Sequence, residues 1–161
     1  MKRVTVLTAL AGFGFGILIA QETAPAPVFS AAQADAGKAE YRNTCVKCHT
    51  DTLRGRNGDP GEMPLVSTLP EDMQKMIRDR NGKVPPLAGP YFLARWGERS
   101  AGDLAQRIKE AVGGFPPDGK DDQTFLNITA YVLQVNGARP GAQPLTATTT
   151  TEVNSLVAKH Q

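Results

Sequence analysis

The two cysteines of this 161-residue chain lie three positions apart, in the run Cys45-Val46-Lys47-Cys48-His49. The pattern C-x-x-C-H is the attachment signature of a c-type haem. The thiols of Cys45 and Cys48 can form thioether bonds to the two vinyl groups of the porphyrin. His49 directly follows the second thiol and can bind the iron as its proximal ligand, a common way of holding haem iron. The spacing therefore predicts one covalently bound haem c.

Other uses of the same residues fit the sequence less well. A structural zinc site takes four ligands, but the chain has no third cysteine and its only other histidine is His160. A thioredoxin-like C-x-x-C would stand near a βαβ pattern, and none is visible around Cys45. A disulfide between Cys45 and Cys48 would leave the adjacent His49 without a role.

The N-terminal segment predicts export. Lys2 and Arg3 precede 17 uncharged, largely apolar residues from Val4 to Ala20, which is the pattern of a secretory signal. We expect residues 1–34 to form a signal peptide that is cut after Ala32-Gln33-Ala34. A cut after Ala20, or a retained membrane anchor, are the alternatives. Covalent haem attachment takes place outside the cytoplasm, so the expected location is the periplasm.

Charge and composition exclude some partners. The net charge of the whole chain is +2, and removing Lys2, Arg3 and Glu22 with the signal lowers it to +1. Such a weak field gives no reason to expect a nucleic-acid partner. The basic cluster Arg78, Arg80 and Lys83 could steer an acidic partner, or it could simply be the solvated end of a helix.

Helical patterns recur along the chain, and strand patterns are few. Stretches bounded by capping residues or glycines run from Asp35 into the haem motif, from Pro70 to Arg80 with Thr68 as cap, from Tyr91 to Trp96, from Ser100 to Gly113, and from Asp121 or Asp122 to Gly137. We therefore predict an all-α domain over residues 35–137. The Pro-, Gly- and Thr-rich tail, 138–161, should wrap loosely over its surface.

With these elements placed, the chain resembles a class I cytochrome c. The resemblance implies a fold in which the N- and C-terminal helices cross around one covalently bound haem, with Gly37 and Tyr41 meeting Tyr131 and Val132. It also implies a proline carbonyl that accepts a hydrogen bond from Nδ1 of His49, best matched by Pro86. Leu87 would then pack on the porphyrin.

A narrower resemblance covers most of the chain after residue 35. The strings Pro-Pro-Leu-Ala-Gly at 85–89, Pro-Pro-x-Gly at 116–119 and Ala-Tyr-Val-Leu-Gln-Val-Asn-Gly at 130–137 are similar to mono-haem cytochrome domains associated with quinoprotein (PQQ-dependent) dehydrogenases. This implies that a dehydrogenase of that class donates electrons to the haem. Relative to these domains, residues 56–84 look like an inserted loop and helix.

The chain departs from that family at Phe115. The family carries Met-Pro-Pro in this loop, and the methionine is the sixth iron ligand, whereas this chain has Phe115-Pro116-Pro117. Met63, in a Gly- and Pro-rich loop, could replace it, while Met73 and Met76 suit the apolar face of a helix. His160 or a lysine could also reach the iron from a flexible segment. Otherwise the iron is five-coordinate or holds water, with Phe115 as an apolar lid.

These residues predict an electron-transfer protein with redox partner proteins, and not an enzyme. The alternative is a haem protein whose open sixth position binds or senses a small ligand, because an apolar lid favours ligand binding over ligand activation. A peroxidase-like activity would need a distal acid or base, and only Asp118 stands in the loop around Phe115.

Overall fold

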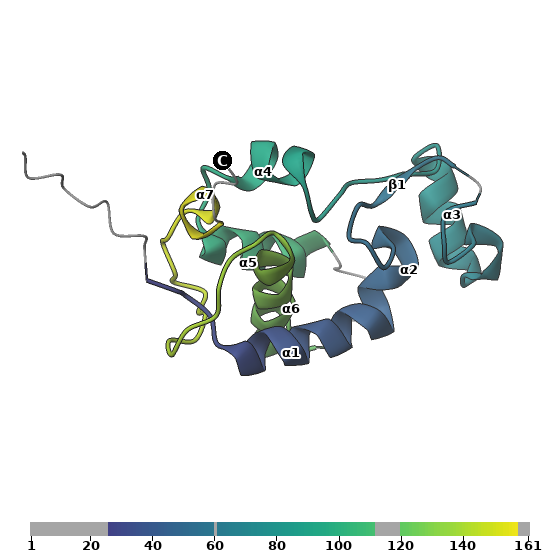
Figure 1. Ribbon diagram of the computed structural model, residues 1–161. Coiled ribbons are helices and arrows are strands. Elements are labelled where there is room, and N and C mark those ends of the chain that lie inside the picture. Colours follow the sequence, from purple (N-terminus) through teal and green to yellow (C-terminus); the bar gives the residue numbers. More distant parts are fainter. Residues whose placement is uncertain (1–25, 60, 112–119, 158–161) are drawn as a thin grey trace, which may run out of the picture.

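The structure is a computed structural model that describes residues 26–59, 61–111 and 120–157, and it is mostly helical (Figure 1). Within these residues a two-stranded ladder pairs β1 with β2 in antiparallel fashion. The elements follow in the order α1 (Ala31–Glu40), the π-helix η1 (Tyr41–Cys45), α2 (Val46–His49), β1 (Arg56–Asn57), the 3-10 helix η2 (Val66–Thr68), α3 (Glu71–Asp79), β2 (Lys83–Val84), α4 (Pro90–Trp96), α5 (Ala101–Ala111), α6 (Asp122–Val135) and α7 (Val153–Leu156).

The crossing of α1 and α6 organises the fold, as the predicted family resemblance required. A Cβ atom on Gly37 would lie 1.8 Å from the Asn127 carbonyl oxygen, so only glycine lets the two backbones approach this closely. One turn later the rings of Tyr41 and Tyr131 meet with centroids 5.5 Å apart, a favourable distance for an aromatic pair. Gly37 thus meets the Asn127–Ile128 backbone, one turn before the expected Tyr131.

Helix α1 begins at Ala31, four residues before the expected start at Asp35. Ser30 caps it in a reciprocal capping box with Gln33, which satisfies two backbone N–H groups at the helix start. Phe29 and Ala34 are fully buried in the main core. The folded domain therefore begins before residue 35.

The tail does not wrap loosely, as its composition had suggested. Leu145 and Val153 are buried in the main core with the side chains of α6. The Gln33 side chain donates to the Leu145 carbonyl and accepts from the Leu145 N–H, at 3.0 and 2.7 Å. Backbone hydrogen bonds also join Ala101 to Thr151 and Gly102 to Thr149 at the start of α5. The tail is an integral part of the domain.

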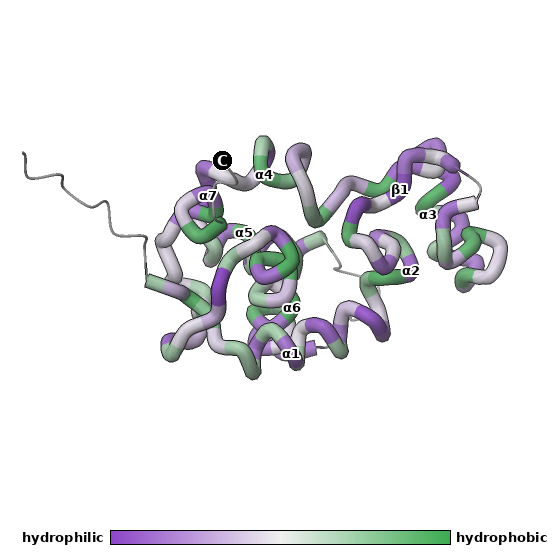
Figure 2. The backbone as a smooth tube through the Cα atoms, in the orientation of Figure 1, coloured by the Kyte–Doolittle hydropathy of each residue, from purple (hydrophilic) through white to green (hydrophobic). Residues whose placement is uncertain are grey.

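Residues 56–84 form a small lobe beside the haem motif (Figure 1). Leu69, Met73, Ile77 and Val84 make a second buried cluster, against which Cys48 packs. Figure 2 shows hydrophilic and hydrophobic segments alternating around α3, as expected for a helix with one buried face. Pro70 is the N-cap of α3, and Thr68 donates to the Leu65 carbonyl instead of capping the helix as predicted.

Replacing Gly37 with alanine tests the helix crossing. The new methyl group would overlap the Asn127 carbonyl, so α1 and α6 would have to separate. We expect the free energy of unfolding of the purified protein to fall by about 3 kcal/mol, the upper end of ordinary overpacking costs, in a denaturant titration. Gly61→Ala is the matched control, because its Cβ would meet only an Asp59 carboxylate oxygen at 3.3 Å. Equal stability of the two variants would contradict the crossing.

Candidate haem site

The three predicted haem-binding side chains lie at the end of one continuous helical segment. Helix α1 passes through η1 into α2, so Cys45 and Cys48 stand on adjacent turns and His49 follows at the last position of α2. The π turn widens the helix at Tyr41–Cys45, and such turns are frequent at functional sites. Both thiols are free and partly buried. The structure thus brings Cys45, Cys48 and His49 together as the spacing predicted.

The orientation of His49 is fixed by a proline carbonyl, but by Pro85 and not by Pro86. Nδ1 of His49 lies 2.9 Å from the Pro85 carbonyl oxygen. When Nδ1 donates this hydrogen bond, Nε2 is the nitrogen that remains free. The predicted register was one residue too late. Leu53 fixes which proline faces His49. The Leu53 carbonyl accepts hydrogen bonds from the Leu87 N–H at 2.7 Å and from the Ala88 N–H at 3.1 Å.

The electrostatics of the motif suit a neutral ligand. Burial lowers the pKa of His49 to about 4, with a smaller contribution from the Arg80 charge, while the bond to Pro85 opposes the shift. The imidazole is therefore neutral at physiological pH, the form that binds a metal. Burial also raises the pKa of the Cys45 and Cys48 thiols, which keeps them protonated.

Leu87, which we expect to pack on the porphyrin, lies half-buried against the main core. Its carbonyl accepts a hydrogen bond from the side-chain amide of Asn136, at 2.9 Å, and the same side chain accepts from the Gly89 N–H at 3.0 Å. Asn136 therefore ties the 85–89 segment to the end of α6. The sequence reasoning missed this role, although Asn136 stands in the string 130–137 that carried the family resemblance.

Arg56 is the second residue that the sequence reasoning missed. Its side chain is only 4% exposed, and its guanidinium donates to the carbonyls of Lys47, Glu62 and Pro64. The Lys47 carbonyl belongs to the haem motif and the other two to the inserted lobe, so Arg56 fastens one to the other. No sequence pattern marks an arginine as buried, because arginines are usually exposed.

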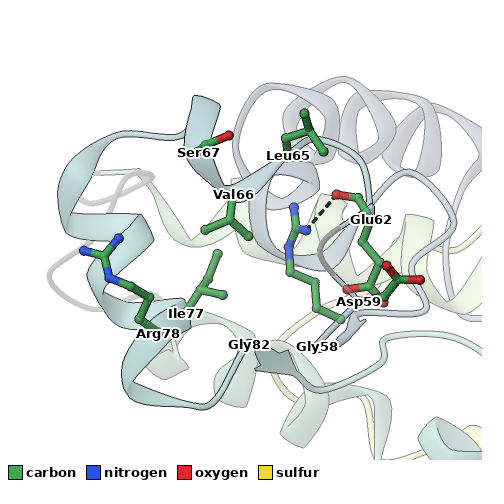
Figure 3. A pocket seen from close by; sticks show the side chains of 10 residues that line it. Gly58, Asp59, Glu62, Leu65, Val66, Ser67, Ile77, Arg78 and Gly82 are labelled. Atoms are coloured by element: carbon green, nitrogen blue, oxygen red, sulfur yellow. Dashed lines mark hydrogen bonds between the residues drawn. The ribbon is translucent and has the colours of Figure 1, made fainter.

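The lobe also contains an open hollow of about 310 Å³ (Figure 3). Val66 and Ile77 line it from η2 and α3, and the dashed line in Figure 3 marks the bond that the Glu62 carbonyl accepts. The haem-motif residues Cys45, Cys48 and His49 do not line this hollow. It is a feature of the lobe and not of the haem site.

The structure does not bring Met63 to the site. Its side chain is 63% exposed and lies beside Thr50, Thr52 and Arg54, in the segment that directly follows His49. The hollow that Met63 shares with these residues is not lined by Cys45, Cys48 or His49. Met73 is buried in the lobe cluster. Phe115 and His160 lie outside the described residues.

Comparison with protein-family models finds a match to the family described as cytochrome c oxidase, cbb3-type, subunit III, over residues 32–132. This stretch contains the haem motif, the lobe and most of α6, and it spans more than half of the chain. The chain belongs to this family of c-type cytochrome domains. Searches of curated proteins and of solved structures find no significant match.

As a c-type cytochrome, the protein carries one covalent haem c, and its fold is the all-α cytochrome c fold. The observed residues fit this group. Each thiol can add across one vinyl group, with its sulfur bonding to one carbon and its hydrogen going to the other. His49, neutral and oriented by Pro85, offers Nε2 to the iron. When bound, the haem supplies a one-electron couple at its iron.

Two further findings concern the residues that the structure describes. Within residues 26–59, 61–111 and 120–157, no three His, Cys, Asp or Glu side chains gather as a metal cluster. The helices in these ranges include none that is both long and apolar enough to cross a membrane.

A double variant, Cys45→Ala with Cys48→Ala, tests the attachment. Without the thiols no thioether can form, so the porphyrin should be fully extractable with acidified organic solvent, whereas the wild type retains it. Thr44→Ala is the control, because Thr44 Oγ1 lies 3.6 Å from the Cys45 sulfur but carries no thiol. Haem that stays bound to the double variant through denaturation would overturn the assignment.

Proposed function

We propose that this cytochrome is a periplasmic carrier of single electrons, which it accepts from a quinoprotein dehydrogenase and delivers to a respiratory acceptor. The observation that carries the electron-transfer role is the locked proximal ligand, with His49 held to the Pro85 carbonyl at 2.9 Å. A fixed second-shell hydrogen bond orients the ring and sets its basicity. The ligand then needs little rearrangement when the iron changes oxidation state.

Two observations support the proposed partners. The strings at 85–89, 116–119 and 130–137 resemble those of cytochrome domains that accompany PQQ-dependent dehydrogenases, which suits an electron donor of that class. The matching family is described as a subunit of a cytochrome oxidase, which suits a respiratory acceptor. The test is reduction of the oxidised cytochrome by a purified PQQ-dependent alcohol dehydrogenase with its substrate. If the cytochrome titrates reversibly with one electron but is not reduced by the dehydrogenase, the electron-carrier function stands and this class of donor is excluded.

We also propose that the protein is exported and that its signal peptide is cleaved upstream of Phe29. A cut after Ala34 would remove the fully buried Phe29 and the Gln33 side chain that holds Leu145. Losing a buried phenylalanine alone costs about 3–5 kcal/mol. We therefore favour the alternative cut after Ala20, which keeps both residues.

The mass of the secreted holoprotein tests this cut. We expect a mass that corresponds to a start between Gln21 and Phe29 plus one haem. A product that starts at Asp35 and still binds haem covalently with wild-type stability would contradict the proposal.

A second candidate function, an open sixth position that binds a small ligand, is favoured by the placement of Met63 and Met73. Met63 is exposed next to the chain that follows His49, and Met73 is buried in the lobe. We expect the reduced holoprotein to change its optical spectrum on adding carbon monoxide, and Met63→Leu to leave the spectrum unchanged. A far-red thioether–iron band in the oxidised form that disappears in Met63→Leu would instead identify Met63 as the ligand.

A further inference from the structure

Three exposed cations gather at the end of the lobe where its chain returns to the haem site. They are Arg78, Arg80 and Lys83, and we call them the basic turn. The Lys83 N–H donates to the Arg80 carbonyl at 3.1 Å, which closes a four-residue turn. Asn81 and Gly82 both have positive φ, 54° and 76°, as the centre of a type I′ turn requires. The turn is therefore well defined, and its cations stand on a fixed backbone.

The basic turn lies next to the proximal ligand. Lys83 and Val84 pair with β1, and the chain then enters Pro85, whose carbonyl holds His49. Only Val84 separates Lys83 from Pro85, so their Cα atoms are within about 7 Å. Pro85 is itself exposed. One hydrogen bond and one residue thus connect the ring of His49 to solvent, at a point flanked by the basic turn.

Among the residues that the structure describes, no carboxylate forms an ion pair with a cation of the basic turn. The ion pairs within the described ranges of the chain include Lys75 with Asp79 but none made by Arg78, Arg80 or Lys83. Arg78 donates only to the neutral side chain of Gln74. A cation in the last turn of a helix also stabilises the helix dipole, which accounts for Arg78. Lys83 lies beyond the end of α3, so the dipole does not account for it.

We infer that the basic turn, with the exposed Pro85 beside it, is the docking surface for a redox partner that presents a patch of carboxylates. The inference rests on the proposed electron-carrier function and names the partner's chemistry. Complementary charges speed the encounter and fix the orientation of transient complexes. Docking here would place the partner's surface next to the Pro85 carbonyl and hence close to His49.

The test uses a gold electrode coated with a carboxylate-terminated monolayer as the acidic surface, with intact holoprotein. Wild type should adsorb as an electroactive film at about 0.01 M salt and leave it at about 0.15 M, because the Debye length falls from about 30 Å to about 8 Å. Arg80→Glu with Lys83→Glu should lose at least about tenfold in film coverage, within the range of electrostatic steering. The control is Lys38→Glu with Arg139→Glu, two exposed cations on α1 and the tail, which changes the net charge equally.

The outcomes separate the surface from the function. Coverage lost only in the Arg80 and Lys83 variant supports the docking surface, whereas equal coverage of the two double variants overturns it. Solution voltammetry of all three proteins tests the carrier function independently. A wild-type protein without a reversible redox couple would contradict the electron-carrier function but would not bear on the docking surface. Binding to phosphatidylglycerol vesicles at about 0.15 M salt that requires Arg80 and Lys83 would assign the surface to a membrane and overturn the protein partner.

Discussion

The fold of this cytochrome depends on the close approach of two backbones at Gly37, where α1 crosses α6. Because residue 37 has no side chain, the two helices meet at their backbones, and the ring of Tyr41 can then reach Tyr131 one turn later. Helix α1 continues without a break into the haem motif, so this crossing also determines where Cys45, Cys48 and His49 stand. A change at Gly37 would therefore act on the haem site at a distance, by moving the helix that carries it.

The second half of the proximal site comes from a different part of the chain. Pro85 follows directly on the β1–β2 ladder, and Arg56 fastens the same ladder to the haem motif through the Lys47 carbonyl. The Tyr41 hydroxyl adds a further tie, because it donates to the Thr50 carbonyl at 2.6 Å just beyond His49. The inserted lobe is thus the support of the proximal histidine and not an appendage. Its small core, packed on Cys48, gives that support its rigidity.

What could be predicted from the sequence depended on how local each signal was. The haem motif was readable, since a fixed spacing acts within one helix, and the helix contact of Gly37 was expected from the family resemblance. Ser30-x-x-Gln33 is also a readable capping box, but the signal-peptide interpretation absorbed it. The choice between Pro85 and Pro86 was not readable, because the Leu53 carbonyl settles it from 32 residues away in the chain.

The burial of the tail was missed because it, too, depends on contacts that are distant in the sequence. Its Thr- and Pro-rich composition is typical of a surface segment, and only its contacts with Gln33 and α5 bury it.

Net charge is a poor guide to how this cytochrome meets a partner. Residues 56–84 contain five basic and five acidic residues and are neutral as a whole. Their order along the chain separates the signs: Glu71 and Asp72 begin α3, where the helix dipole favours anions, and Arg80 and Lys83 follow its end. The charge of Arg80 acts on the pKa of both His49 and Cys48, so the basic residues that follow α3 lie near the haem motif. A partner approaching at physiological salt senses charges only within about 8 Å. It would therefore respond to the basic turn and not to the average of the molecule.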